Sequence, residues 1–330
     1  MTAIVQDRYG ADATSVLKME KSPRPEIGAG EVLVQVRAAG LDRGTWHLMT
    51  GLPYAARLAF GLRTPRTRVP GRDLAGVVVE VGGDVTRFEP GDEVYGTGKG
   101  SFAEYAAAAE GRLARKPSNL SFEQAAAVPV SGLTALQGLC NVGRLEAGWH
   151  VLVIGASGGV GTYAVQIANA LGAEVTGVCS TGKVEFVRSI GADHVLDYTR
   201  DNFAAGDQRY DLILDIGGSS PLRQLRRSLT PRGTLVIAGG EVGRWLGISR
   251  QLRAVALSPF TRQRLTMLIS KERHDDLERL TEMIEAGRVE PVIERTYPLD
   301  QAAMAMKHLA SGQVRGKLVV VPCDPNGANR

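Results

Sequence analysis

The second half of the chain alternates short apolar runs with amphipathic stretches. The run Val151–Ile154 leads into a glycine-rich loop and then into a helical stretch, Tyr163–Leu171. Strands that are apolar on both faces and separated by helices are typical of a parallel sheet that is covered on both sides. The alternation continues downstream, with strands expected at Glu174–Cys179, Leu212–Ile216 and Leu235–Ala238, and a helix at Val184–Ile190.

The first part of the chain, from Thr2 to about Leu120, has a different pattern of elements, with strands and turns. Strand-like stretches follow one another closely there, at Val32–Ala38, Gly71–Gly82 and Glu93–Gly96, with Pro and Gly between them. Short strands separated by Pro and Gly residues predict an antiparallel, barrel-like domain.

The tail returns to strand character after the parallel part. Ser121 followed by Gln124 fits a helix N-cap with a capping box, and it marks the start of the second domain. We interpret the tail as rejoining the first domain, which makes that domain discontinuous, with boundaries at 1–122, 123–265 and 266–330. The tail is expected to form helices at Asp276–Ala286 and Asp300–Ser311 and strands at Val289–Tyr297 and Lys317–Val321.

One stretch, Val242–Arg264, combines apolar side chains with interleaved arginines. It predicts an amphipathic helical cap beside the substrate cleft, where it would shape an apolar pocket. Association with a membrane surface is the alternative interpretation of the same pattern.

Length and charge limit the classes of protein that the chain can be. A chain of 330 residues is long enough for two domains. The net charge is +4, with arginine concentrated at Arg223–Arg232 and Arg244–Arg264. A cofactor-binding or solvated surface is favoured over nucleic-acid binding, because no nucleic-acid module accompanies the charge. RNA binding stays open as a weaker alternative, and its steep salt dependence would reveal it.

The three cysteines, Cys140, Cys179 and Cys323, are widely spaced and form no disulfide framework or zinc ribbon. A reducing cytosol is the simplest location for such a chain. The sequence begins without a recognisable signal peptide. It also has no apolar run near the ~20 residues of a membrane span, so no stable membrane insertion is expected.

The glycine-rich loop that follows Val151–Ile154 is the strongest chemical signal. It reads Gly155-Ala-Ser157-Gly158-Gly159-Val160-Gly161, a G-x-x-G-x-x-G spacing, and it lies between a strand and a helix as a dinucleotide fingerprint requires. Gly158 would let the backbone approach a pyrophosphate, and Gly161 would let the helix pack on its strand. The helix N-terminus would offer N–H groups to the phosphates. The sequence therefore predicts a Rossmann nucleotide-binding unit.

The end of the next strand indicates which nicotinamide cofactor binds. An NAD site usually places Asp or Glu there to accept hydrogen bonds from the ribose. This chain has Ser180, Thr181 and Lys183 instead, with no acid until Glu185. Ser and Thr can donate to a 2′-phosphate and Lys can neutralise it, so NADPH is favoured over NADH. A polar turn with a solvated lysine is the alternative.

Zinc is not expected from the sequence. The histidines His47, His150, His194, His274 and His308 are scattered singly, and none has the spacing of metal ligands. Hydride transfer needs a positioned acceptor and a group that polarises its carbonyl. Polar candidates in the first domain are Asp42, Trp46, Tyr54 and Arg72, although each could instead be a turn or packing residue and Arg72 could simply pair with Asp73.

Four segments together resemble one family, the medium-chain dehydrogenase/reductase superfamily, and in it the zinc-free quinone oxidoreductase-like branch. Gly71–Val78 resembles the family's Gly-His-Glu-x-x-Gly-x-Val signature, and Gly91–Val94 resembles its Gly-Asp-x-Val turn. Ala156–Gly161 is close to the quinone-reductase form of the nucleotide loop, and Gly312–Val319 resembles the usual ending. The resemblance covers nearly the whole chain and implies a GroES-like catalytic domain beside the Rossmann domain.

The departures from the family pattern concern the metal. Where zinc-dependent members carry a cysteine ligand, this chain has Asp42; their histidine is replaced by Arg72, and the third ligand position falls near Val130. The cysteine lobe of the structural zinc is missing between Tyr95 and Ser101. Alcohol oxidation would lack its Lewis acid, whereas hydride addition to a conjugated acceptor needs none.

The resemblance also implies roles for individual residues. Tyr54 resembles the substrate-cleft tyrosine of the quinone reductases, and Asp42 replaces their usual asparagine. Tyr198 resembles the tyrosine on the 2′-phosphate side of the NADPH-using members. Thr134, Ala238, Gly239 and Gly240 are expected to lie at the nicotinamide, and Asp215-Ile-Gly217-Gly218 is expected to border the cofactor. The family further implies a homodimer joined through edge strands of the nucleotide domains.

The sequence thus favours an NADPH-dependent, zinc-independent reductase of a quinone or an α,β-unsaturated carbonyl. An NADPH-binding sensor or interaction protein with little turnover is the alternative function.

Overall fold

Two large sheets organise the computed structural model, which describes residues 1–239 and 248–322. They belong to two units. Unit 1 takes residues 1–130, 272–285 and the chain from 291 onward, and unit 2 takes residues 131–271 and 286–290. Within the described residues, no helix combines the length and the apolar character that a bilayer crossing requires.

Unit 2 contains a six-stranded sheet in the order β10-β9-β8-β11-β12-β13, with every neighbouring pair parallel. Numbered along the chain from β8, this is the 3-2-1-4-5-6 order of a dinucleotide-binding fold. The prediction of a doubly wound parallel sheet is confirmed. The strands are β8 (His150–Ile154), β9 (Glu174–Cys179), β10 (His194–Asp197), β11 (Tyr210–Asp215), β12 (Leu229–Ile237) and β13 (Arg264–Met267).

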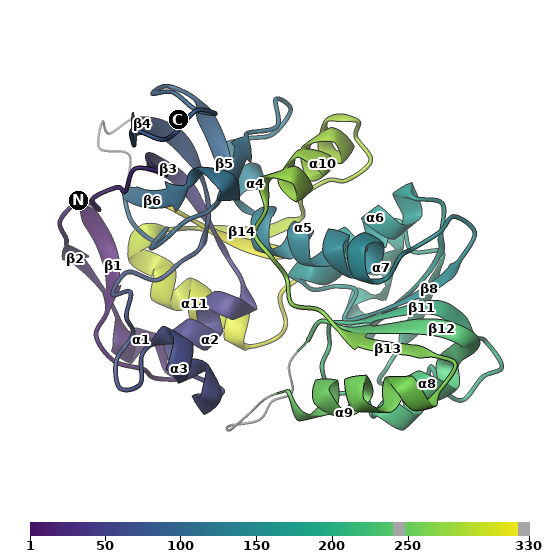
Figure 1. Cartoon of the computed structure of the whole chain (residues 1–330). Helices are drawn as coiled ribbons and strands as arrows, with labels where there is room; N and C mark the ends of the chain where they lie inside the picture. The colour runs from purple at the N-terminus through teal and green to yellow at the C-terminus, as the bar shows by residue number, and fades with distance from the viewer. Residues whose placement is uncertain (240–247, 323–330) are drawn as a thin grey trace. The chain divides into compact units, whose positions relative to one another are not determined.

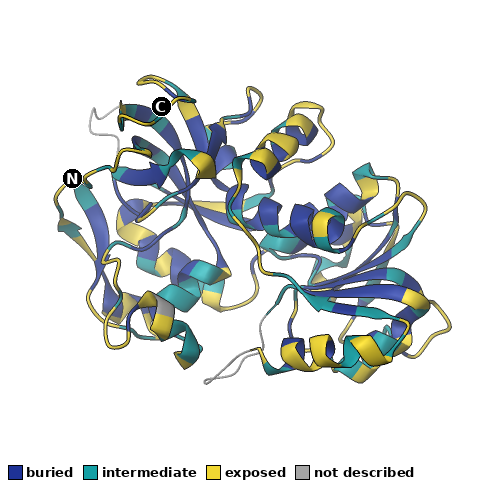
Figure 2. Ribbon diagram, in the orientation of Figure 1, coloured by how far each residue is buried: buried dark blue, intermediate teal, exposed yellow. Residues whose placement is uncertain are grey.

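Helices cover both faces of this sheet. Figure 1 shows α6 and α7 over one face and α8 and α9 over the other, and Figure 2 shows the central strands buried between them. Leu152, Ile213 and Leu235 are completely buried. The helices are α5 (Pro129–Leu136), α6 (Gly159–Ala170), α7 (Val184–Ser189), α8 (Leu222–Ser228) and α9 (Ser249–Leu257), with a π-helix at η3 (Gln137–Val142) and short 3₁₀ turns at η4 (Thr181–Lys183) and η5 (Ser258–Phe260).

The stretch expected to be one helix, Val242–Arg264, is divided in the structure. Its middle forms α9, but the helix ends before Pro259, and Arg264 begins the edge strand β13. Leu265 of that strand is buried against β12. The prediction of helix up to residue 264 was wrong, because the helix ends before Pro259 and the chain then turns into the edge strand. Residues 240–247 of the stretch lie outside the described residues.

Unit 1 is built around β3, an eleven-residue strand that pairs with β4, β6 and β15. Its sheet runs β14-β15-β3-β4-β5-β7, and only β14 and β15 are parallel to each other. The C-terminal tail therefore joins the N-terminal strands in one sheet. The strands are β3 (Glu31–Leu41), β4 (Asp73–Val81), β5 (Glu93–Thr97), β6 (Tyr105–Ala109), β7 (Leu113–Arg115), β14 (Ile293–Pro298) and β15 (Lys317–Val321), beside a separate β1 (Thr2–Gln6) and β2 (Leu17–Lys21) pair.

Short helices close the ends of unit 1. The capping box predicted at Ser121 and Gln124 is confirmed, with both reciprocal hydrogen bonds formed at the start of α4. The helices are α1 (Ala13–Val16), α2 (Arg43–Thr50), α3 (Arg57–Phe60), α4 (Phe122–Ala126), α10 (His274–Glu285) and α11 (Ala302–Ala310), with turns at η1 (Tyr54–Ala56), η2 (Glu110–Arg112) and η6 (Leu299–Gln301).

A buried ion pair connects the first strands of unit 1 with its last. The Nζ atom of Lys317 on β15 lies 3.0 Å from Oδ2 of Asp73 on β4, and both side chains are almost fully buried. Oδ1 of Asp73 accepts a hydrogen bond from the backbone N–H of Val130. Burial raises the pKa of Asp73 from 3.8 to about 6, although Lys317 opposes that shift. Removing one partner of such a pair leaves an uncompensated buried charge.

Lys317→Met is therefore expected to lower the free energy of unfolding by about 3–5 kcal/mol at pH 8. The loss should be smaller at pH 5. Without Lys317 the folded-state pKa of Asp73 rises further above its unfolded value, so the penalty of ionising Asp73 grows as the pH rises. Urea unfolding at the two pH values measures both effects.

The double variant Asp73→Asn/Lys317→Met is the control for this prediction. It carries neither charge, and its asparagine can still accept from Val130, so it should recover most of the lost stability. A double variant as unstable as Lys317→Met would contradict the charge explanation.

Candidate active site

The glycine-rich loop leaves β8 and turns sharply into α6. Gly155 has a positive φ of 90°, a conformation that favours glycine. The N–H groups of Gly155 and Ala156 both donate to the carbonyl of Val178 on β9, which fixes the loop to the neighbouring strand. A Cβ on Gly161 would lie 2.1 Å from the carbonyl oxygen of Gly155. The first turn of α6 thus packs directly on the backbone that leaves β8.

Gly158 has a different environment from Gly161. A Cβ there would have only one neighbour within 4 Å, at an ordinary contact distance of 3.7 Å. Gly158 is the N-cap of α6, and it provides no side chain to cap the helix. The N–H groups of Gly159, Val160 and Gly161 have no acceptor within the helix because they lie in its first turn. The space beside Gly158 and the free N–H groups of the first turn together form a place where a phosphate group could accept hydrogen bonds.

The end of β11 lies beside this loop, where the strand order of the sheet reverses. The N–H groups of Ile216 and Gly217 donate to the carbonyl of Ile154 at the end of β8. The N–H groups of Ala238 and Gly239, which follow β12, donate to the carbonyl of Asp215. In open α/β sheets, ligands bind at this reversal beside the carboxyl ends of the strands. Gly217, Ala238 and Gly239 are thus gathered at one edge, and Gly240 lies outside the described residues.

A buried ion pair that the sequence did not reveal holds these loops in place. Nη1 of Arg250 on α9 lies 2.5 Å from Oδ2 of Asp215, and the other carboxylate oxygen accepts from the N–H of Gly218. Burial raises the pKa of Asp215, and Arg250 opposes the shift. Gln251 donates to the carbonyl of Gly239. The resemblance implied that Asp215 borders the cofactor, but no sequence pattern indicated its partner Arg250, which comes from a distant helix.

The ends of β9 and β10 bring another acid into the proposed cofactor region. The hydroxyl of Thr181 donates to Oδ2 of Asp197, the last residue of β10, at 2.5 Å. Asp197 also accepts from the N–H and hydroxyl of Thr199, and these hydrogen bonds lower its pKa. The hydroxyl hydrogen of Thr181 is therefore already used in the hydrogen bond to Asp197. Ser180 and Lys183 remain the candidate donors to a 2′-phosphate, with Tyr198 exposed beside Asp197.

Two of the four polar candidates in unit 1, Asp42 and Arg72, meet around Gly44. A Cβ built on Gly44 would lie 2.7 Å from Oδ1 of Asp42 and 3.3 Å from Nη1 of Arg72. Asp42 is the N-cap of α2, and it accepts hydrogen bonds from the N–H and hydroxyl of Thr45. Asp42 therefore has a structural role in starting the helix, whatever it contributes to chemistry.

Arg72 does not pair with its neighbour Asp73, so that interpretation was wrong. Arg72 forms an ion pair with Glu272, which also lies 3.1 Å from Arg112. The reason is the strand pleat, since adjacent residues of an extended chain point to opposite sides. About a third of the Arg72 side chain is exposed.

The remaining candidates lie on helical segments. Tyr54 is half-exposed on η1, with the guanidinium of Arg57 4.8 Å from the centre of its ring. Thr134 is half-buried on α5. Trp46 packs edge-on against His47, whose Nδ1 lies 2.8 Å from the carbonyl oxygen of Leu52. Desolvation by burial lowers the pKa of His47.

Metal ligands are not gathered anywhere in the described part of the chain. No three His, Cys, Asp or Glu side chains there are placed to hold an ion together. Cys140 and Cys179 are both free thiols in the structure, and Cys323 lies outside the described residues.

Comparison with known proteins identifies the family. A family model described as a zinc-binding dehydrogenase matches residues 190–320, and one described as an alcohol dehydrogenase GroES-like domain matches residues 28–118. The chain is 32% identical to a chloroplast envelope quinone oxidoreductase homolog of Arabidopsis thaliana, over 98% of each chain. The chain belongs to the medium-chain dehydrogenase/reductase superfamily.

Two further superfamily members are also similar. An NADPH-dependent alkenal/one oxidoreductase of Arabidopsis thaliana chloroplasts is 34% identical, over 98% of this chain and 80% of its own. The solved quinone oxidoreductase of Coxiella burnetii is 29% identical and superimposes with a TM-score of 0.87, over 97% of this chain and 99% of its own. The predicted GroES-like domain, the superfamily and the assignment as an oxidoreductase are confirmed.

Alanine at Gly158 and alanine at Gly161 are expected to change different properties, namely cofactor affinity in the first case and thermal stability in the second. Gly158→Ala has room in the structure, so the protein should keep its thermal stability but lose at least about tenfold in nicotinamide cofactor affinity, because the new methyl occupies the side from which a pyrophosphate approaches. Gly161→Ala should lower the melting temperature by several degrees, because its Cβ collides with backbone.

Gly111→Ala, at a turn with open space around it, is the matched control and should change neither property. Thermal unfolding and cofactor fluorescence titration measure the two effects. Unchanged cofactor affinity in Gly158→Ala would refute the placement of the pyrophosphate.

Proposed function

We propose that this protein is an NADPH-dependent, zinc-independent reductase of a quinone or an α,β-unsaturated carbonyl. The observation that carries the proposal is the pair Asp42 and Arg72, which lie together at Gly44. The resemblance to the family implies that zinc-dependent members carry a cysteine and a histidine ligand at these two positions. An arginine is always protonated and cannot ligate a metal. The names of the similar quinone and alkenal/one oxidoreductases support the same substrate class.

The cofactor proposal rests on the end of β9. That strand ends at Cys179 without an acid, and Ser180 and Lys183 follow it. The carboxylate of Asp197, at the end of the neighbouring strand β10, already accepts hydrogen bonds from Thr181 and Thr199 and lies 3.7 Å from Arg200. Its charge is therefore largely compensated within the protein, so that it is compatible with a 2′-phosphate nearby.

The residues of the chain would act mainly by positioning. When bound, NADPH supplies the hydride for the conjugated carbon of the acceptor. Gly158 and the first turn of α6 would hold the pyrophosphate, and Gly217 would border the cofactor. Ala238 and Gly239 would lie at the nicotinamide, with Thr134 and Gly240 completing that region. The partly exposed Arg72 would polarise the carbonyl oxygen of the acceptor. Tyr54 or solvent would supply the proton that completes the reduction.

We further propose a homodimer joined through edge strands of the nucleotide-binding units. The described edge strand β13 is four residues long and pairs on one side with β12. Its other side offers backbone groups that a second copy could satisfy. A cytoplasmic location is proposed from the three scattered cysteines.

Lys183→Ala tests the cofactor choice. It should raise the KM for NADPH at least about tenfold and change the KM for NADH less than about twofold, because only NADPH carries the phosphate that Lys183 would neutralise. Steady-state kinetics with each cofactor measure the difference. Lys307→Ala, an exposed lysine of unit 1, is the control. An equal rise in the KM for NADPH and for NADH would contradict the placement of Lys183 at the 2′-phosphate.

An acceptor panel tests the reaction. Protein dialysed against a chelator should still oxidise NADPH in the presence of a benzoquinone, a naphthoquinone or an enone, because no metal polarises the acceptor. Tyr54→Phe should lower kcat about a hundredfold if Tyr54 donates the proton, and leave kcat unchanged if solvent does. NADPH binding without turnover on any acceptor would instead favour the sensor function, and stoichiometric zinc would contradict the proposed chemistry.

A further inference from the structure

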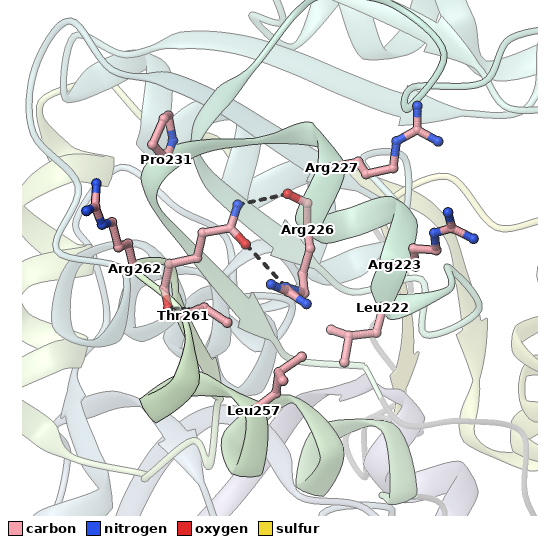
Figure 3. A pocket seen from close by; sticks show the side chains of 9 residues that line it. Leu222, Arg223, Arg226, Arg227, Pro231, Leu257, Thr261 and Arg262 are labelled. Carbon is pink, nitrogen blue, oxygen red and sulfur yellow. Dashed lines mark hydrogen bonds between the residues drawn. The ribbon is translucent and has the colours of Figure 1, made fainter.

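A pocket of about 590 Å³ opens on the surface of unit 2, beside α8 and the end of α9. The two arginine-rich stretches of the sequence converge there, one from α8 and the other from the turn before β13. Figure 3 shows side chains from both stretches around the same hollow. The pocket is lined by Leu222, Arg223, Arg226, Arg227, Pro231, Leu257, Thr261, Arg262 and Gln263.

Four of the lining residues are arginines, and none is an acid. Arg223, Arg227 and Arg262 are exposed, and in the described part of the chain none of the three forms an ion pair. Four positive charges in one hollow equal the net charge of the whole protein, which is +4. Like charges gathered without a counter-charge repel one another, so an anion would stabilise this arrangement.

One arginine is held in place inside the pocket. Nε of Arg226 donates to Oε1 of Gln263 at 3.3 Å, and Nε2 of Gln263 donates back to the carbonyl of Arg226 at 2.9 Å. Figure 3 shows Arg226 between Arg262 on one side and Arg223 and Arg227 on the other. A guanidinium fixed in this way loses less conformational entropy when a ligand binds, and its planar fork matches the geometry of phosphate oxygens.

The pocket is not only polar. Leu222, Leu257 and Pro231 provide apolar surface between the arginines, and the lining contains no lysine. Inorganic anions gain nothing from apolar contacts, whereas the organic part of a nucleotide-sized molecule does. The combination therefore favours a ligand with both a phosphate group and an apolar or aromatic part.

The pocket is separate from the proposed cofactor edge. Pro231 lies near the start of β12, and Gln263 directly precedes β13, so the pocket reaches the amino ends of these parallel strands. The glycine-rich loop follows the carboxyl end of β8. Ligands at the two places would occupy opposite edges of the same sheet.

We propose that this arginine pocket is a second ligand site, which binds a small organic polyphosphate of nucleotide size. The site goes beyond the proposed reductase function and does not depend on it. Arg223, Arg227 and Arg262 would bind phosphate oxygens around the fixed Arg226, while Leu222 and Leu257 would contact the organic part.

Isothermal titration of the full-length protein with ADP tests the site, first alone and then with saturating NADPH. ADP alone can also enter the proposed cofactor edge, so the titration in saturating NADPH isolates the pocket. There we expect one saturable ADP site to remain, with a Kd of about 1 mM or tighter at low salt. Inorganic pyrophosphate should bind there more weakly than ADP. Arg223→Gln/Arg227→Gln should weaken ADP binding at least about tenfold, because two charge-assisted contacts are lost.

The matched control is Arg209→Gln/Arg253→Gln, which removes the same charge from exposed positions outside the pocket. It should change ADP affinity less than about twofold. Equal losses in both double variants would reduce the effect to general surface charge and overturn the proposal. It would also fail if ADP bound only in competition with NADPH, or if pyrophosphate bound as tightly as ADP.

A single-stranded RNA oligonucleotide is included as a separate arm. If RNA bound more tightly than ADP, with a steep dependence on salt and on Arg223 and Arg227, the pocket would belong to a nucleic-acid surface instead. That result would also overturn the proposal.

Discussion

The close approach of Gly161 to the carbonyl of Gly155 determines the geometry of the nucleotide-binding unit. The separation leaves no space for a side chain, so the start of α6 lies directly on the turn that leaves β8. The free N–H groups of the helix are thereby placed at the carboxyl edge of the sheet, next to the loops that follow β11 and β12. The first turn of α6, which is proposed to hold the pyrophosphate, depends on this contact for its position.

Two buried ion pairs fix the loops and strands around which chemistry is proposed. Arg250 holds Asp215 at the end of β11, and Lys317 holds Asp73 at the start of β4. In each pair the carboxylate also accepts backbone N–H groups, from Gly218 in one and from Val130 in the other. Buried charges are tolerated when partners and hydrogen bonds satisfy them, and the same bonds restrict the backbone. Asp73 lies next to Arg72, so the second pair also fixes the strand that presents Arg72.

The arginines of this protein fall into groups with different surroundings. Arg250 is buried against an acid, Arg72 shares Glu272 with Arg112, and the arginines of the surface pocket lie together without acids. The modest net charge of the protein is therefore distributed unevenly, with some arginines neutralised by acids and others not. These differences, more than the overall charge, indicate where anions would bind.

The sequence by itself determined the order of elements, the glycine-rich loop and the superfamily, because hydrophobic periodicity and short motifs are local properties. It gave β9 and β15 with their observed bounds and the capping box at Ser121. It did not find the strand β13, which is short and begins at the last residue of an arginine-rich stretch. Only the tertiary structure paired Asp215 with Arg250, Asp73 with Lys317 and Thr181 with Asp197, and brought two arginine-rich stretches to one pocket. Such contacts join residues far apart in sequence, so only the packing of the folded chain decides them.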